Sequence, residues 1–199
     1  MAKTCQKSET GSGEQPRSHM AMLQRLYLVR HGETAWSLSG QHTGRTDIPL
    51  TEQGERDARE LAERLRGMNF SRVFTSPLKR ARRTYELAAL NKVAEIEPDL
   101  AEWDYGDYEG QRAGDIRKGR PDWNVFRDGC PRGESPIQVS KRADRLIARL
   151  RTLEGDLAIF SHGHFLRVLG GRWIGQPPTA GERLALRPAT ISVLGWERE

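Results

Sequence analysis

Two histidines in this chain stand one residue beyond an apolar segment, and the imidazole ring is a group that can act on phosphorus. His31 follows the apolar residues 26–29, lies beside Arg30 and precedes Gly32. A neutral imidazole, with an unperturbed pKa of about 6.5, is a competent nucleophile near neutral pH. The planar guanidinium of Arg30 matches two phosphoryl oxygens, and Gly32 lets the backbone approach closely. The alternative is a histidine whose ring is satisfied by local backbone hydrogen bonds, and this motif alone does not decide between the two.

A second His-Gly pair, His162-Gly163, follows the apolar residues 157–160. An imidazole at this position could face the first one and donate a hydrogen bond to a phosphoryl oxygen as charge develops. His162 and His164 could instead ligate a metal. The chain lacks Asp and Cys companions at the spacing that usually completes a metal site. We therefore expect no metal and no cofactor.

Further charged side chains complete a candidate phosphate site. Arg80 stands one turn into a helix that Ser76 and Pro77 are expected to begin. Helix N-termini favour anions, and an arginine there adds a bidentate clamp. Glu102, in a loop rich in aromatic and acidic residues, could protonate a leaving alkoxide if Trp103 or Tyr105 partly shields it from water. Other carboxyls of that loop compete for the role, and the residues alone do not choose among them: Asp104, Asp107 and Glu109.

Strands and helices alternate along the chain. Short apolar runs predict strands at residues 26–29, 73–75, 93–96, 157–160 and 190–196. Capping residues and helical spacing predict helices from Thr51 to Gly67, from Ser76 to about Ala89, from Ser135 to Leu153 and from Phe165 to Ile174. Residues 99–110 and the exit loop 161–164 are expected to be irregular.

This alternation predicts an α/β fold, a three-layer α/β/α sandwich with a mostly parallel sheet. In such folds the reactive cleft lies beyond the carboxyl ends of the strands. Each candidate residue follows a predicted strand, so polar groups far apart in the chain converge on one edge of the sheet.

Composition sets the broad class of the protein. The 199 residues are 36% hydrophobic and 30% charged, which is typical of one soluble globular domain, and we place it at residues 23–199. Residues 1–22 have no apolar signal region and are expected to be a disordered tail or an expression tag. The chain contains no run of about 18 apolar residues, so we expect no membrane-spanning helix. Two cysteines, Cys5 and Cys130, are too few for a secreted disulfide scaffold, so we expect a cytoplasmic location.

The net charge of +5 allows either an anionic small substrate or a nucleic-acid partner. Basic and acidic residues are mixed, as at residues 55–57 and 141–144. No basic stripe with interleaved aromatics is visible, as nucleic-acid binding would require. We therefore expect a small-molecule phosphate monoester as partner, and neither nucleic acid nor a membrane. Aromatic residues that we expect to be exposed, such as Trp123 and Trp173, could serve a homodimer.

These motifs, in this order and spacing from Leu23 to Glu199, resemble the histidine phosphatase superfamily, which includes cofactor-dependent phosphoglycerate mutases and small phosphatases. The resemblance implies that His31 is the phosphohistidine nucleophile, Glu102 the acid and base, and His162 the second histidine of the site. It also implies a set of phosphate or substrate contacts: Arg30, Arg80, Ser37, Thr43, Gly44 and Gly163.

Within that superfamily the chain is similar to a branch of acid and sugar phosphatases. This similarity rests on residues 39–44, 102–110 and 127–130. It implies metal-independent hydrolysis of small phosphate monoesters, for example sugar phosphates, through a phosphohistidine. The alternative is a cofactor-dependent phosphoglycerate mutase, an enzyme that must exclude water. Because mutases of the resembling group are usually longer, with an insertion and a tail over the site, we favour hydrolysis.

Overall fold

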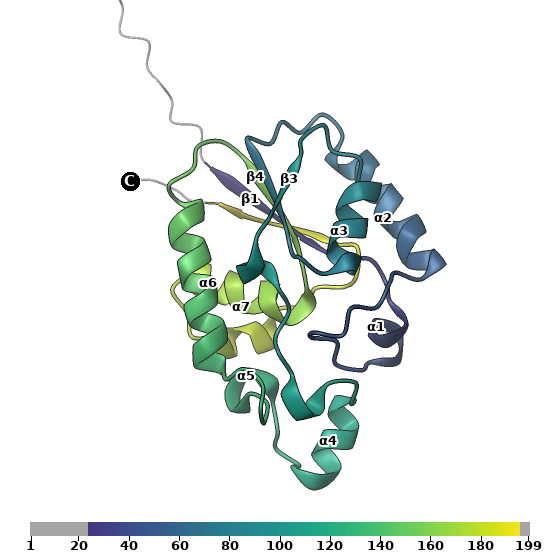
Figure 1. Ribbon diagram of the computed structural model, residues 1–199. Helices are drawn as coiled ribbons and strands as arrows, with labels where there is room; N and C mark the ends of the chain where they lie inside the picture. Colours follow the sequence, from purple (N-terminus) through teal and green to yellow (C-terminus); the bar gives the residue numbers. More distant parts are fainter. Residues whose placement is uncertain (1–23, 196–199) are drawn as a thin grey trace, which may run out of the picture.

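A central five-stranded sheet organises the protein (Figure 1). The computed structural model describes residues 24–195. The strands are β1 Arg25–Arg30, β2 Arg72–Thr75, β3 Ala94–Ile96, β4 Leu157–Ser161 and β5 Ile191–Gly195. Their spatial order is β3-β2-β4-β1-β5, and only β5 runs antiparallel to its neighbour. The predicted α/β fold with a mostly parallel sheet is confirmed, whereas the predicted tail, residues 1–22, lies outside the described residues.

Four longer helices pack on the sheet, and shorter ones surround its carboxyl edge. The longer helices are α2 Glu52–Leu65, α3 Lys79–Leu87, α6 Pro136–Leu150 and α7 Gly163–Trp173. The short elements are α1 Ala35–Ser39, α4 Ala113–Gly119 and α5 Val125–Asp128, with 3-10 turns at Pro98–Leu100, Gly106–Tyr108 and Pro178–Arg183. None of the helices between residues 24 and 195 has both the length and the apolar character needed to span a bilayer.

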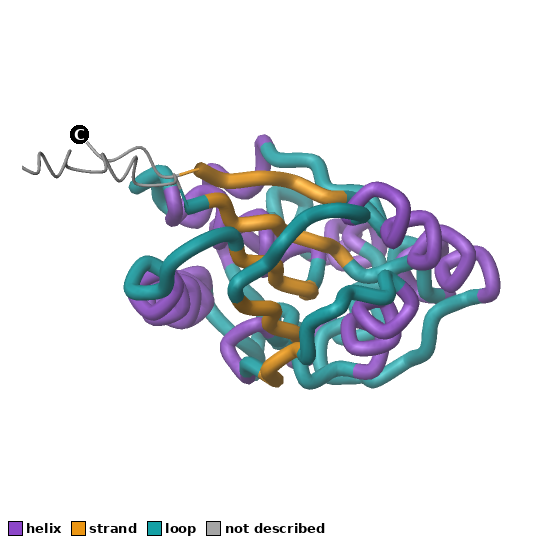
Figure 2. Tube along the Cα trace, turned by 90° about the horizontal axis from the view of Figure 1, so that it is seen from above, coloured by secondary structure: helices purple, strands orange, loops and turns teal. Residues whose placement is uncertain are grey.

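The sheet has a hydrophobic core on each face, which makes the molecule three-layered (Figure 2). Along β1, Leu26 and Leu28 join the core that contains α6 and α7 side chains, while Tyr27 and Val29 join the core that contains α2 side chains. A parallel strand buried on both faces has no polar side, which explains why the sequence shows continuous apolar runs here. The four parallel strands β1, β2, β3 and β4 end at one common edge.

The predicted helix starts are correct where a capping side chain is present in the structure. Thr51 caps α2 by accepting the Gly54 N–H, and Ser135 forms a capping box with Gln138 at the start of α6, both as expected. The predicted start of α3 is wrong. This helix begins at Lys79. The Lys79 N–H donates to Asp47 Oδ1 at 2.8 Å, and not to Ser76.

Two further expectations need correction. Helix α7 starts at Gly163, so His164 lies in its first turn and not in a loop. Trp123 and Trp173, which we expected to be exposed, are only 3% and 4% exposed and belong to the core. They therefore do not form an interface, and the homodimer stays a prediction.

Candidate active site

His31 lies at the end of β1 with its ring almost buried, 5% exposed. Its Nδ1 is 2.7 Å from the Gly32 carbonyl oxygen. A carbonyl only accepts, so Nδ1 carries the proton and Nε2 keeps its lone pair. Burial, and then the charges of Arg30 and Arg80, hold the pKa of His31 well below its usual 6.5. His31 is therefore neutral, with Nε2 available as a nucleophile.

Gly32 allows a close approach of the backbone, but it is the backbone of α2, rather than a phosphate, that lies against it. A Cβ at Gly32 would stand 2.4 Å from the Gly54 carbonyl oxygen in the first turn of α2. The Gly32 N–H donates to Thr84 Oγ1 of α3 at 3.0 Å. Gly32 thus fixes the position of His31 against the two helices on this face.

Arg30 supplies positive charge beside His31. Its Nη1 donates to the Leu186 carbonyl oxygen, while its buried Nε has no hydrogen-bond partner among the described residues. A Cβ at residue 163 would stand 3.0 Å from the Arg30 Cζ, so glycine is needed there to let the guanidinium lie over the start of α7. An orphaned buried N–H is costly, and an anionic oxygen would satisfy it.

His162 and Arg80 are fully buried and form the wall behind His31. Arg80 Nε donates to His162 Nδ1 at 3.2 Å, so the His162 proton is on Nε2, which donates to Ser76 Oγ at 2.7 Å. The His31 and His162 ring centroids are 5.2 Å apart. Burial and the Arg80 charge hold the pKa of His162 well below its usual value, so this ring is also neutral. Donation from His162 to a phosphoryl oxygen requires that its N–H leave Ser76.

Arg80 holds the loop that carries Thr43 and Gly44. Its two Nη groups donate to the carbonyl oxygens of Thr43, Gly44 and Thr46 at 2.9–3.0 Å. With Nε bound to His162, only one of its five N–H groups is left for a substrate. Thr43 lines the cavity at His31, whereas Gly44, a predicted phosphate contact, does not.

Glu102 is the one carboxyl, among the described residues, that lines this cavity. Its Oε1 accepts the backbone N–H groups of Trp103 and Phe165, each at 2.8 Å, and its Oε2 accepts that of His164 at 3.1 Å. Oε2 has a single donor and so retains capacity for a transferable proton. The competing carboxyls have other partners: Asp104 pairs with Arg45, Asp107 with Arg132, and Glu109 binds the N–H groups of Gly44 and Thr46.

Arg142 fixes the chain segment that carries Glu102. It donates to the carbonyl oxygens of Asp99 and Ala101, each at 2.7 Å, and of Glu102 at 3.3 Å. Its Nε and Nη2 also bind both oxygens of Glu134, at 3.0 and 2.8 Å. This bidentate pair positions the Glu102 backbone without touching the cavity at His31.

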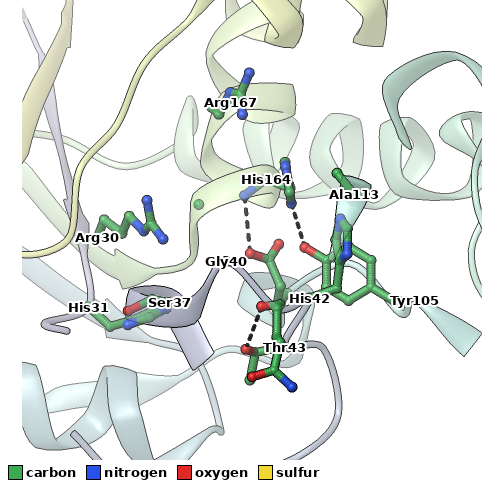
Figure 3. Close-up of a pocket in the computed structure, with 13 residues that line it drawn as sticks. Arg30, His31, Ser37, Gly40, His42, Thr43, Tyr105, Ala113, His164 and Arg167 are labelled. Carbon is green, nitrogen blue, oxygen red and sulfur yellow. Dashed lines mark hydrogen bonds between the residues drawn. The ribbon is translucent and has the colours of Figure 1, made fainter. Parts of the chain in front are cut away.

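The cavity has a volume of about 270 Å³ and contains residues that sequence patterns did not single out (Figure 3). Ser37, predicted as a phosphate contact, lines it, as does Gly163. The other lining residues are Gly40, Gln41, His42, Tyr105, Ala113, His164 and Arg167. Most of them belong to loops or motifs named in the sequence analysis, but Ala113 and Arg167 do not, because they lie on α4 and α7 with no motif around them. Between residues 24 and 195, no group of three or more His, Cys, Asp or Glu side chains is arranged to hold a metal.

Residues 26–199 match the family model of the histidine phosphatase superfamily, branch 1. The chain belongs to this superfamily. The resemblance seen in the sequence is thereby confirmed.

Three curated relatives are similar over most of the chain. The acid phosphatase of Mycobacterium tuberculosis is 46% identical, covering 87% of this chain and 87% of the relative. Sedoheptulose 1,7-bisphosphatase of Saccharomyces cerevisiae is 39% identical over 76% of this chain and 68% of the relative. A probable phosphoglycerate mutase GpmB of Cronobacter sakazakii is 36% identical over 89% and 86%. A solved structure of an open reading frame product from Mycobacterium tuberculosis has a TM-score of 0.84 at 42% identity, covering 87% of this chain and 92% of that one.

The Arg142–Glu134 pair yields a prediction on stability. Arg142→Met leaves Glu134 without its partner in a largely buried place, and we expect a loss of about 3 kcal/mol in the free energy of unfolding. Chemical denaturation measures it. Arg145→Met, one turn along the same face and paired with Asp99 at an exposed position, should stay close to the parent. Equal losses in the two variants would contradict the role of the buried pair.

Proposed function

We propose that this enzyme is a phosphatase that hydrolyses small phosphate monoesters, such as sugar phosphates, through a phosphohistidine at His31. The observation that carries the proposal is a neutral, nearly buried His31 in one cavity with Arg30 and Glu102, with no hydrogen bond to its Nε2 from any described residue. Cavities that bind small molecules usually measure about 300–1,000 Å³, so this one suits a compact substrate. The superfamily and its acid phosphatase relative support the same reaction.

In the first half of the reaction, the Nε2 lone pair of His31 forms a bond to phosphorus while the bond to the ester oxygen breaks. The leaving alkoxide takes a proton from Glu102 Oε2. Arg30, with its unpartnered Nε, and the buried charge of Arg80 stabilise the phosphoryl oxygens of a loose transition state. The products of this half are an alcohol and phosphohistidine.

In the second half, Glu102 is a carboxylate and takes a proton from water. The water oxygen attacks phosphorus, the bond to Nε2 breaks, and its electron pair returns to the ring. Inorganic phosphate leaves and Glu102 is again protonated. No step requires a metal, because arginine side chains supply the positive charge.

The low pKa of His31 fits activity on the acid side. Since burial and the neighbouring arginines hold its pKa well below 6.5, the nucleophile stays unprotonated when the solution becomes mildly acidic. The nucleophile is therefore still available below neutral pH.

Phosphoglycerate mutase is the alternative, and one observation removes the argument from chain length against it. Relatives with that name match this chain over 86% of their own length, so the expectation that a mutase would be longer does not separate the two activities. Hydrolysis is supported by the higher identity to the acid phosphatase, 46% against 36%.

The nucleophile can be tested directly. His31→Ala should lower kcat at least a thousandfold, roughly, because the covalent route loses its nucleophile. Rapid quench with labelled substrate should trap acid-labile, alkali-stable phosphate on the parent enzyme and none on the variant. A variant that keeps a large share of activity, in the same folded state, would overturn the mechanism.

The acid can be tested by varying the leaving group. Glu102→Gln should lose about a hundredfold or more on an alkyl phosphate, whose alkoxide needs a proton, and far less on p-nitrophenyl phosphate, whose phenolate leaves unaided. Asp104→Asn removes a carboxylate paired with exposed Arg45. It should change the rates on the two esters by the same factor. Equal losses on the two esters in Glu102→Gln would assign the acid to another residue.

The fate of the phosphohistidine separates phosphatase from mutase. If water reaches it, most of the phosphoryl group should appear as inorganic phosphate, and this activity should persist in mildly acidic solution because the pKa of His31 lies well below 6.5. The assay follows 2-phosphoglycerate and free phosphate from 3-phosphoglycerate, with and without 2,3-bisphosphoglycerate. Fast isomerisation that depends on the bisphosphate, with little phosphate released from any ester, would make the enzyme a mutase.

A further inference from the structure

Arg80 is completely buried, yet no carboxylate among residues 24–195 lies within salt-bridge distance of it. Its N–H groups instead bind His162 Nδ1 and the carbonyl oxygens of the loop at residues 43–46. Burying a cation without a counter-ion is costly. A negative group that acts on Arg80 from beyond its direct partners would offset part of that cost.

Glu109 lies on the other side of the loop that Arg80 holds. Its Oε1 accepts the Gly44 N–H at 2.8 Å and the Thr46 N–H at 3.1 Å, and its Oε2 is 3.1 Å from the same Gly44 nitrogen. The Gly44 N–H and the Thr43 carbonyl belong to one peptide group, and Arg80 Nη2 donates to that carbonyl oxygen at 2.9 Å. This single trans peptide is thus bound by the cation at one end and by the carboxylate at the other.

A peptide group between opposite charges transmits part of their interaction. Its dipole of about 3.5 D has the oxygen toward the guanidinium and the N–H toward the carboxylate. Hydrogen bonds in such a chain polarise one another, and bonds to charged groups are the stronger ones. Burial lowers the pKa of Arg80, and among the carboxylates Glu102, Asp47 and Glu109 oppose that shift. Glu109 therefore acts as a counter-ion of Arg80, although no salt bridge joins the two side chains.

Gly44 makes this arrangement possible. A Cβ at this position would stand 2.5 Å from the Trp103 carbonyl oxygen and 2.7 Å from Glu109 Oε2, so glycine is needed to let the peptide reach the carboxylate. Residues 43–46 belong to no helix or strand and include no apolar side chain that could anchor them. The loop therefore depends on Arg80 and Glu109 for its position.

We propose that Glu109 is a positioning residue for the reaction: through the peptide at residues 43–44 it holds the Arg80 guanidinium in the orientation that binds a phosphoryl group. The same orientation keeps Arg80 Nε on His162 Nδ1 and so fixes the tautomer of His162. The proposal rests on the proposed function, because Arg80 acts there on a phosphoryl group. Glu109 itself does not line the cavity at His31, so its contribution passes through Arg80.

The first test asks whether Glu109 works through Arg80. Glu109→Ala should lower kcat/KM roughly ten- to hundredfold, as for a displacement of a positioned group by about 1 Å. Glu109→Gln keeps an acceptor oxygen for the two N–H groups and should lose less. In an Arg80→Lys enzyme, whose ammonium lacks the guanidinium fork, Glu109→Ala should lose less than about threefold. The same loss in both backgrounds, or no loss in the parent, would overturn the proposal.

The leaving group separates positioning from proton transfer. Because Arg80 acts on the phosphoryl oxygens of any ester, Glu109→Ala should lower the rates on an alkyl phosphate and on p-nitrophenyl phosphate by the same factor. A larger loss on the alkyl ester would make Glu109 a proton donor and overturn the positioning role.

The matched control is Asp107→Ala, in the same turn but paired with Arg132 at an exposed position. It should leave the rates on both esters close to those of the parent. A loss as large as that of Glu109→Ala would show a general effect on the turn and would count against the proposal.

The tautomer of His162 gives a readout that needs no activity. The parent should show one protonated and one unprotonated ring nitrogen in nitrogen NMR, assigned by the loss of these signals in His162→Gln. In Glu109→Ala the two shifts should approach each other, because Nδ1 loses its fixed donor, while Asp107→Ala should keep the parental shifts.

This readout separates a failure of the positioning role from a failure of the proposed function. If the parent hydrolysed no ester, yet the His162 shifts still depended on Glu109, the positioning of Arg80 would stand and the phosphatase proposal would fall. Unchanged shifts in Glu109→Ala, in an active phosphatase, would remove the positioning role alone.

Discussion

Three arginines at the active site are held by backbone carbonyl oxygens and, within residues 24–195, by no carboxylate. Arg30 bonds to Leu186, Arg167 to Gly181 and Glu182, and Arg80 to the loop at residues 43–46. Carbonyl dipoles satisfy N–H groups without cancelling the charge. The protein therefore keeps a net positive region at the cavity, at a cost in stability that a bound anion offsets.

Burial, and then this uncancelled charge, set the protonation of the histidines. Desolvation and the nearby guanidinium groups both disfavour a charged imidazole, and they lower the pKa values of His31 and His162 together. The tautomers then follow from single contacts, Gly32 O for His31 and Arg80 Nε for His162. The neutral state of His31 and the positive charge around it thus both depend on the buried arginines.

Part of this arrangement could be predicted from the sequence, because it depends on local patterns. Apolar runs located the strands, and Arg30 and His31 follow from a motif at a strand end, whereas Glu102 was chosen among the carboxyls of its loop only through the family resemblance. The role of Ser76 could not be predicted, since its hydroxyl binds His162, which is 86 residues away, instead of capping α3. Arg167 was missed for a similar reason: its helical spacing is ordinary, and only the fold brings the 181–182 carbonyls to it.

The short helix α1 also could not be predicted from the sequence. The five residues of α1 include no buried one, so no apolar periodicity marks this helix, and a local capping box between Thr34 and Ser37 holds its start. The loop that follows α1 is anchored more firmly, by buried His42, which packs on Tyr105 and Trp123, and by hydrogen bonds such as Gln41 Nε2 to the Gly110 carbonyl oxygen at 2.8 Å.

In the proposed mechanism, access of water to the phosphohistidine depends on the wall that α1 and the following loop give the cavity. Leu38 of α1 is 70% exposed and contributes no buried anchor, while Ser37 and Gly40 beside it line the cavity. Segments with few buried apolar contacts open more readily than the core. A mutase must keep water away for the lifetime of the intermediate, and this requires a well-anchored cover. The α1 part of the wall, which has a capping box and no buried residue, is better suited to an enzyme whose second substrate is water.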